Sequence, residues 1–208
     1  MIKFVYFDVG GVVIDDFSGN DGWSQLKAEI GVTTQMDEHF MAAWYPYEQE
    51  VVVGRDIETL LPIFKEKFGL PTNKDYSLLD GFVKRFKVNK PIWPIIEKVK
   101  QKHRVGLLTN MYPNMLDAIE QKNLLPDIAW DVVVDSSVEM LKKPDFKLYE
   151  LAEQKAAAKG KELLFIDNNV GHLDAAKAFG WRVYHYDSSD HVQSSRKLEL
   201  FLKAQSII

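Results

Sequence analysis

Cysteine is absent from this chain of 208 residues. Disulfide bonds, zinc sites built from thiolates and cysteine nucleophiles are therefore excluded, because each of them needs at least one thiol. The absence also removes any need for an oxidising compartment. The chemistry of the chain must therefore come from carboxylates, hydroxyls, amides, amines or imidazoles.

Charge of one sign is also scarce. The chain has 26 lysines and arginines against 30 aspartates and glutamates, a formal net charge of -4, and no basic stripe. We therefore expect neither nucleic acid nor a membrane surface as a partner. No segment is apolar over the thickness of a bilayer, and the first residues lack the apolar core and cleavage site of a signal peptide. A cytoplasmic location is the default expectation.

Apolar residues are plentiful and follow a pattern. They make up 46% of the chain, which is enough to bury a sizeable core. Five apolar runs predict strands, most of them followed by a stretch of helical character: Ile2–Phe7, Arg104–Leu108, Asp131–Val134, Leu163–Ile166 and Arg182–Tyr186. Runs that are apolar along their whole length indicate strands covered on both faces. The sequence therefore predicts an α/β fold with a doubly wound parallel sheet.

Residues 15–89 follow a different pattern. Apolar residues recur there every three or four positions, which is typical of amphipathic helices that pack on one another. We predict a helical cap domain over 15–89, inserted after the first strand, and an α/β core domain made of 1–14 and 90–208. Most aromatic residues of the cap should pack in its core, but one or two of Trp44, Tyr45 and Tyr47 are candidates for facing a substrate.

Polar residues stand where the predicted strands end. Asp8 follows the first strand, Thr109 and Asn110 follow the second, and Asp167 follows the fourth. Ligands of open parallel sheets bind outside the carboxyl ends of the strands. We therefore expect these side chains and the loop after Val134 to meet in one crevice.

The segment around Asp8 is the most informative. A buried strand delivers this single carboxylate, and Gly10 and Gly11 follow it, which allows backbone N–H groups to approach an anion. A lone carboxylate beside an anion site fits a nucleophile that attacks phosphate. The alternative is an ordinary turn or cap residue at the end of a strand.

Three further motifs could complete such a site. The hydroxyl of Thr109 and the amide of Asn110 can grip phosphate at a helix start, although the same pair is also a plain N-cap. Lys143, in the sequence Lys-Lys-Pro-Asp, can neutralise both a phosphate and a carboxylate, whereas most lysines are solvated surface charges. Asp8 and Asp167 could hold one hard divalent cation such as Mg²⁺.

In this order, the four motifs resemble those of the haloacid dehalogenase-like hydrolase superfamily over essentially the whole chain. They are Phe7–Val12, Leu108–Asn110, Lys143–Asp145, and Phe165–Asn169 with Asp174–Ala176. The resemblance implies that Asp8 is a nucleophile that becomes an aspartyl-phosphate and that Lys143 balances charge. It also implies a Rossmann-like core, and the predicted insertion resembles the helical C1 cap of the family.

The same resemblance implies the ligands of the substrate and of a metal. Thr109 and Asn110 would bind the transferring phosphoryl group, together with Gly11. The cofactor would be Mg²⁺, held by Asp8, the carbonyl of Gly10 and Asp167.

Two positions depart from the family pattern. Phosphatases of the family usually carry a second Asp two residues after the nucleophile, as general acid and base, and here that position is Gly10. Losing a positioned acid or base typically costs about 10²–10⁴-fold in rate, unless the leaving group is good or another group substitutes. His172 is one candidate for this acid and base. Alternatively, it is an ordinary residue on the open surface of a helix. Asn168 stands where the family often has a second acid, which should weaken Mg²⁺ binding without abolishing the site.

These departures select among relatives. Gly10 argues against a phosphomutase, and Asp167 argues against a metal-free dehalogenase, because such dehalogenases have serine at that position. The chain most resembles C1-capped phosphatases with glycine at this place, including enzymes that act on sugar phosphates such as glucose 1-phosphate. The sequence therefore predicts a Mg²⁺-dependent phosphatase of a small phosphorylated metabolite, with sugar phosphate favoured. The alternatives are a weakened member that binds a phosphorylated ligand or a partner protein, and a metal-independent haloacid dehalogenase. The sequence predicts neither which compound is the substrate nor the oligomeric state.

Overall fold

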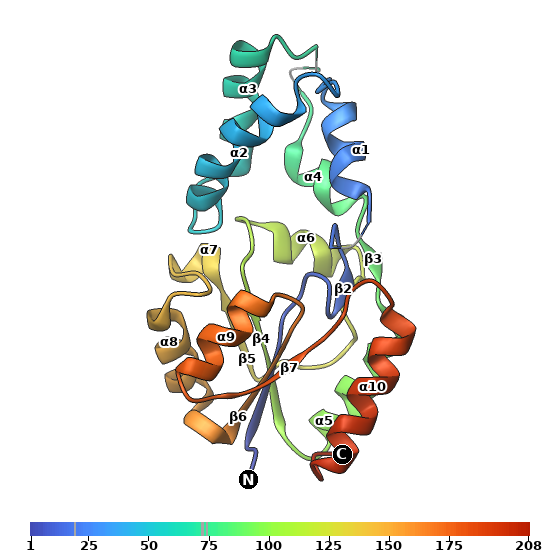
Figure 1. The fold of residues 1–208 in the computed structure, drawn as a ribbon, viewed down its shortest axis with the longest axis vertical. Helices are drawn as coiled ribbons and strands as arrows, with labels where there is room; N and C mark the ends of the chain where they lie inside the picture. Colours follow the sequence, from blue (N-terminus) through green and yellow to red (C-terminus); the bar gives the residue numbers. More distant parts are fainter. Residues whose placement is uncertain (19, 72, 74) are drawn as a thin grey trace.

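A computed structural model describes residues 1–18, 20–71, 73 and 75–208. Its centre is a sheet of five parallel strands in the order β5-β4-β1-β6-β7 (Figure 1). The strands are β1 (Phe4–Phe7), β4 (Arg104–Thr109), β5 (Val132–Asp135), β6 (Leu163–Asp167) and β7 (Arg182–His185). β1 lies in the middle, β4 and β5 are added on one side of it, and β6 and β7 are then added on the other side. The predicted doubly wound α/β sheet is therefore confirmed.

Helices cover both faces of this sheet. In Figure 1, α5 (Trp93–Lys100) and α10 (His191–Ala204) flank one face, and α8 (Phe146–Ala156) and α9 (Val170–Ala178) flank the other. The remaining helical elements of this part are α6 (Met115–Gln121), α7 (Ser136–Glu139) and the short 3-10 turns η2 (Lys90–Ile92) and η3 (Gly160–Glu162).

Successive strand residues enter two different cores. Val5 and Phe7 belong to a buried cluster with residues of α5 and α10, whereas Phe4 and Tyr6 belong to a second cluster with residues of α8 and α9. The alternation follows from the strand itself, since neighbouring side chains point to opposite faces. All four side chains are fully buried. This two-sided burial is why the strand sequence is apolar throughout.

The chain leaves the sheet between β1 and β4 to form a second group of helices. Two short strands, β2 (Ile14–Asp15) and β3 (Lys87–Val88), pair antiparallel and carry the chain out and back. We call residues 16–86 the insert; its elements are α1 (Gly22–Glu29), α2 (Asp37–Val51), η1 (Ile57–Thr59), α3 (Leu60–Phe68) and α4 (Leu78–Val83). The insert stands beyond the carboxyl ends of the parallel strands (Figure 1). Its division from the core as a separate domain stays a prediction.

Aromatic side chains hold the insert together. Trp44 is buried, and its ring centroid lies 4.8 Å from that of Trp23, 6.1 Å from that of Phe40 and 5.7 Å from that of Phe64. Aromatic pairs at such separations contribute about 0.5–1.5 kcal/mol each beyond the burial of their surface. These aromatic contacts hold the helices of the insert together, and they belong to the same buried cluster as one face of the sheet.

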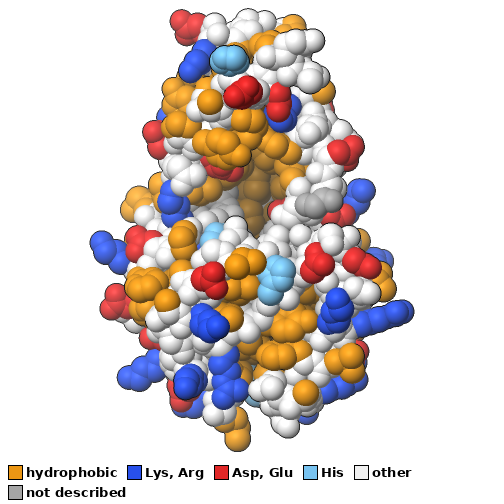
Figure 2. Space-filling model, viewed as in Figure 1, with side chains coloured by type: hydrophobic (Ala, Val, Ile, Leu, Met, Phe, Trp, Pro, Cys, Tyr) orange, Lys and Arg blue, Asp and Glu red, His pale blue; other side chains and the backbone are white. Residues whose placement is uncertain are grey.

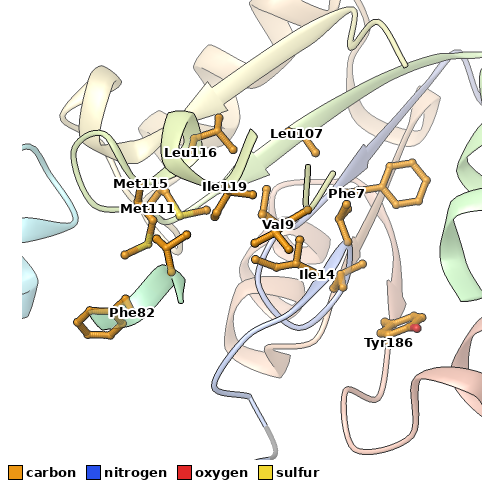
Figure 3. Packing of buried hydrophobic residues seen from close by; sticks show 14 of the residues in the cluster. Phe7, Val9, Ile14, Phe82, Leu107, Met111, Met115, Leu116, Ile119 and Tyr186 are labelled. Atoms are coloured by element: carbon orange, nitrogen blue, oxygen red, sulfur yellow. The ribbon is translucent and has the colours of Figure 1, made fainter. Parts of the chain in front are cut away.

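Apolar packing also joins the insert to the sheet. One buried cluster contains Phe82 of α4, Met111, Met115 of α6 and Val9 after β1 (Figure 3). The insert is therefore oriented by side-chain packing as well as by the two connecting strands. No helix in the described part of the chain combines the length and the apolar character needed to cross a membrane.

Candidate active site

A cavity of about 760 Å³ lies between the insert and the carboxyl ends of the strands. Figure 2 shows the hollow between the two parts of the molecule, with hydrophobic side chains in its depth. The strand-end loops contribute polar residues to its wall, among them Asp8, Asn110, Lys143 and Asn168. These loops therefore meet at one cavity, but Thr109, Asp167 and the residues directly after Val134, which the sequence also predicts there, are not among the described residues of its wall.

Asp8 is held in place by the sheet. Its N–H donates to the carbonyl of Ile166 at 2.9 Å, which extends the pairing of β1 with β6 by one residue. Its Oδ1 accepts from the N–H of Val9 at 2.8 Å, and only 10% of the side chain is exposed. The candidate nucleophile is thus rigidly placed and open only towards the cavity.

Lys143 is the buried cation of the site. Its Nζ lies 3.0 Å from Oδ1 of Asp8 and 2.8 Å from Oδ2 of Asp167, and its side chain is fully shielded from solvent. The ammonium group also lies 5.2 Å from the ring centroid of Phe165. An unpaired lysine at this depth would be strongly unfavourable, so the lysine and the two carboxylates depend on one another.

The close packing moves the pKa values of the two carboxyl groups apart. Burial and the neighbouring Asp167 raise the pKa of Asp8 to about 7, against the opposing effect of Lys143. Burial acts upwards on Asp167 too, but Lys143 and His172 outweigh it and hold the pKa of Asp167 well below its usual range. Burial alone would lower the pKa of Lys143, yet the two carboxylates raise it. Asp167 is therefore the permanent anion of the cluster.

Asn110 fixes the backbone of Lys143. Its Nδ2 donates to the carbonyl of Lys143 at 3.0 Å, and its Oδ1 accepts from the N–H of the same residue at 2.8 Å. The second N–H of the amide takes part in neither of these two bonds. Thr109, the other predicted phosphate ligand, is only 1% exposed at the end of β4 and is not among the described residues of the cavity wall.

The two adjacent lysines point in different directions. Lys142 lines the cavity on the side of the insert, where it binds Gln49 of α2, whereas Lys143 lies between the two buried carboxylates. The loop then enters α8 through Asp145, whose Oδ1 accepts from the N–H of Lys147 at 2.9 Å. The lysine that lies between the two carboxylates is therefore Lys143, the residue that the sequence analysis proposes for charge balance.

Gly11 allows the loop after Asp8 to pass close to Asn168. Its φ of +72° is left-handed backbone, which glycine adopts without strain. A Cβ at this position would overlap Nδ2 of Asn168 and lie 2.9 Å from its Cγ. Asn168, which replaces an acid common in the family, is therefore packed against this loop at the cavity wall.

His172 lies beside the carboxylates and not on an open helix surface, so the surface interpretation is wrong. Its Nδ1 is 3.1 Å from Oδ2 of Asp167, and its side chain is 17% exposed in the cavity wall. Burial lowers the pKa of His172, despite the hydrogen bond to Asp167. Because an ionised carboxylate can only accept, Nδ1 of His172 is the donor in this hydrogen bond.

Ligand atoms for a metal come together here. One ligand atom each of Asp8, Asp167 and His172 lies within 4.8 Å of the others. Gly10, the third predicted ligand, lines the cavity beside them. Carboxylate and carbonyl oxygens are the ligands that Mg²⁺ prefers, and Lys143 balances only one of the two negative charges. The donor set therefore fits Mg²⁺.

Asp16 is a residue that the sequence analysis missed. It follows β2 at the base of the insert, is half-buried, and lines the cavity. Burial raises the pKa of this carboxyl group. A Cβ built on Gly10 would overlap its Oδ2 and lie 3.1 Å from its Cγ. The space beside Gly10 is thus taken by a carboxyl group, which no local motif could reveal because the ribbon of β2 and β3 brings it there.

The insert forms the opposite wall of the cavity. Trp44 and Tyr45 line it, in agreement with the expectation that one or two of three aromatic residues face the crevice. Tyr112 of the core donates a hydrogen bond to Oε1 of Glu48 in α2 at 3.0 Å. This bond ties the insert to the strand-end loops.

The sequence profile of the haloacid dehalogenase-like hydrolases matches residues 2–180 of the chain. The GMP/IMP nucleotidase YrfG of Escherichia coli is 26% identical over 188 residues, which cover 87% of this chain and 81% of the nucleotidase.

Two solved structures illustrate the range of this fold. A HAD family enzyme of Bacteroides thetaiotaomicron, in complex with magnesium and inorganic phosphate, has a TM-score of 0.73 at 15% identity, covering 91% of this chain and 96% of that one. L-2-haloacid dehalogenase from Xanthobacter autotrophicus, with chloropropionic acid covalently bound, has a TM-score of 0.64 at 20% identity, covering 98% and 88%. Both show the same fold, so the choice between their chemistries depends on the site.

Proposed function

The chain belongs to the haloacid dehalogenase-like hydrolases, and we propose that it is a Mg²⁺-dependent phosphatase of a small phosphorylated metabolite, working through an aspartyl-phosphate at Asp8. The observation that carries the proposal is the buried cluster in which Nζ of Lys143 lies 3.0 Å from Asp8 and 2.8 Å from Asp167. It combines a nucleophile, a fixed positive charge and a second carboxylate at one end of the cavity.

Asp167 supports phosphate chemistry over haloacid chemistry. A second buried carboxylate beside the nucleophile would repel the carboxylate of a haloacid, and a metal-free attack on carbon has no use for it. A phosphate dianion instead requires positive charge, which a divalent cation held by Asp8 and Asp167 would supply.

The residues of the chain divide the work of the reaction. Bound Mg²⁺ would neutralise charge on the phosphoryl group. Asp8 would provide the attacking oxygen, and Lys143, which contacts both carboxylates, would offset one of their two negative charges. The free N–H of Asn110 and the loop at Gly11 are placed to hold phosphoryl oxygens. The aromatic side chains of the insert line the side of the cavity opposite the strand-end loops.

A sugar phosphate is our first candidate substrate, and a nucleoside monophosphate is the second. The cavity volume of about 760 Å³ suits a small metabolite of either kind. Its wall contains the aromatic residues Phe17, Trp23, Trp44, Tyr45, Phe82, Phe86 and Tyr112. Such rings stack on nucleobases, and the similar Escherichia coli protein is a GMP/IMP nucleotidase; these two observations are the support for the second candidate.

One experiment tests the proposal. Phosphate release is measured on sugar phosphates, nucleoside monophosphates and 4-nitrophenyl phosphate, with Mg²⁺ and with EDTA, and chloride release from 2-chloropropionate is the control. We expect release that requires Mg²⁺. Asp8→Asn should remain folded by thermal melting and lose at least about 10³-fold in turnover. Asp167→Ala should need much more Mg²⁺.

The other outcomes identify the alternatives. Chloride release without metal would show a dehalogenase. Ligand-induced stabilisation without any phosphate release would show a binding protein. Wild-type turnover in a folded Asp8→Asn protein would mean that the nucleophile is a different residue.

A further inference from the structure

The side chain of Asp16 fills the space beside Gly10, the position at which phosphatases of the family usually carry their proton donor. A Cβ built on Gly10 would lie 3.1 Å from Cγ of Asp16 and 3.8 Å from its Cβ. Oδ2 of Asp16 would overlap this built Cβ. Two carboxyl groups cannot fill this volume together.

Gly10 is required here for space and not for its backbone. Its φ lies outside the left-handed region, in contrast to the φ of +72° at Gly11. The nearest atoms that a side chain at position 10 would meet belong to the side chain of Asp16. The carboxyl group of Asp16 therefore fits only because position 10 has no side chain.

Asp16 also faces the side from which a leaving group departs. It lines the cavity together with Asp8 and Gly10. Its Oδ1 accepts from the N–H of Ser18 at 2.8 Å, which fixes the carboxyl group at the base of the insert. An ester whose phosphorus contacts Asp8 must extend its alcohol part into this cavity, because the sheet lies behind Asp8.

We propose that Asp16 is the general acid and base of the reaction, an inference that rests on the proposed phosphatase function. First, an oxygen of Asp8 bonds to phosphorus and the ester P–O bond breaks. Its electron pair stays on the leaving oxygen, which takes the carboxyl proton of Asp16 and departs as an alcohol. Next, the carboxylate of Asp16 removes a proton from water while the water oxygen bonds to phosphorus. The P–O bond to Asp8 then breaks, phosphate leaves, and both side chains return to their first state.

Two neighbouring groups are less suited to this role. Nδ1 of His172 faces Asp167 at 3.1 Å, so that ring belongs to the carboxylate cluster. Asp15 precedes Asp16 on β2, but its Oδ1 lies 3.5 Å from Nε2 of His191, and it is not among the described residues of the cavity wall. Asp15 is therefore a matched control.

The test is the dependence of the rate on the leaving group. Rates with Mg²⁺ are measured on aryl phosphates of graded leaving-group pKa and on an alkyl phosphate. Asp16→Asn keeps the shape and the hydrogen bond to Ser18. It should lose about 10²–10⁴-fold on the alkyl ester. On 4-nitrophenyl phosphate it should lose less than about tenfold, because that leaving group needs little protonation. Asp15→Asn should leave the dependence unchanged.

A second variant moves the carboxyl group back to position 10. Gly10→Asp combined with Asp16→Ala should hydrolyse the alkyl ester at least about tenfold faster than Asp16→Ala alone. This comparison also decides the question if Asp16→Asn fails to fold. A folded double variant that hydrolyses 4-nitrophenyl phosphate without regaining the alkyl ester would contradict the proposal.

The inference and the proposed function fail separately. An equal loss on all esters, or no loss, in folded Asp16→Asn would overturn the role of Asp16 and leave the phosphatase intact. If the unmodified protein releases phosphate from no ester, the proposed function fails, and the role of Asp16 falls with it.

Discussion

Adjacent residues of the same type have different surroundings at this site. Lys143 is buried between two carboxylates, while Lys142 binds Gln49 at the edge of the insert. Asp16 lines the cavity, while Asp15 lies near His191. Each pair provides a reactive residue and a control of the same chemistry, which makes single substitutions unusually informative.

The first prediction compares the two lysines. Lys143→Ala removes the only cation that contacts both Asp8 and Asp167 among the described residues, so turnover should fall by at least about 10²-fold. The free energy of unfolding should fall by about 3–5 kcal/mol, because two buried carboxylates are left facing one another. Lys142→Ala should change stability by less than about 0.5 kcal/mol. Steady-state kinetics and urea unfolding measure both, and an equal or larger loss of turnover in Lys142→Ala would reverse the assignment.

The second prediction concerns the stability of the metal-free protein as a function of pH. The pKa of Asp8 is about 7 in the folded protein, against an ordinary value of 3.8, so the folded state holds a proton that the unfolded state has released. This contribution is fully present below about pH 4 and is lost as the pH rises through 7. The free energy of unfolding in EDTA should therefore decrease across this window relative to that of Asp8→Asn.

Urea unfolding at a series of pH values measures this difference. The exposed Asp174→Asn is the control and should follow the unmodified protein. Parallel pH profiles for Asp8→Asn and the unmodified protein would show that Asp8 is ionised over the whole window.

At the scale of elements, short connections place the reactive groups. Asn110 joins the end of β4 to the loop that carries Lys143. In the insert, Glu58 of η1 plays a comparable part at the start of α4. Its Oε1 accepts from Oγ of Ser77 at 2.7 Å and from the N–H of Leu79 at 3.0 Å, and its Oε2 accepts from the N–H of Leu78 at 2.9 Å.

The third prediction is that Glu58 stabilises the insert. Glu58→Ala leaves the first donors of α4 without this partner, so the free energy of unfolding should fall by about 1–3 kcal/mol. The exposed Glu66→Ala on α3 is the control, with an expected change below about 0.5 kcal/mol. Equal melting curves for the two variants would show that water replaces Glu58 at no cost.

The elements that can be predicted from the sequence are those whose apolar residues follow a regular pattern within the element itself. The five parallel strands are apolar along their length, and the helices of the insert repeat every three or four residues, so both patterns show locally. The ribbon of β2 and β3 joins residues far apart in the sequence through strands of two residues each, which are too short to show a period. Asp16 depends on this ribbon, and its place beside Gly10 therefore required the structure.

The site follows the same division. Asp8, Lys143 and Asp167 stand at strand ends or in strand-end loops, so the parallel sheet is sufficient to predict that they meet. His172 is one turn into α9, and only the orientation of that helix turns its ring towards Asp167. A sequence pattern gives the spacing of residues along a helix, but it does not give the rotation of the helix about its axis relative to the sheet.

At the scale of the whole molecule, the cavity belongs to neither part alone. The strand-end loops supply Asp8, Asn110 and Lys143, and the insert supplies Asp16 and most of the aromatic wall. The hydrogen bond from Tyr112 to Glu48 and the shared apolar cluster hold the two walls together. Substrate preference should therefore reside in the insert, and the metal requirement in the core.

The fourth prediction tests this separation. Tyr45 lines the cavity although 57% of it is exposed, so Tyr45→Ala should not affect folding beyond about 0.5 kcal/mol. It should raise the KM for the preferred substrate by about tenfold with little change in kcat, because binding is lost equally in the ground and transition states. The Mg²⁺ requirement should not change. Leu200→Ala on the exposed side of α10 is the control, and a change in metal requirement in Tyr45→Ala would contradict the separation.

The overlap between position 10 and Asp16 constrains how the sequence can evolve. A new aspartate at position 10 is tolerated only after the carboxyl group at position 16 has been lost, and the reverse exchange obeys the same order. Descendants of this chain should therefore carry an acid at one of the two positions and a small residue at the other, so that substitutions covary. The path between the two arrangements passes through an ancestor with neither acid. Such an ancestral enzyme would be functional only on phosphate esters with good leaving groups, which need no protonation to depart.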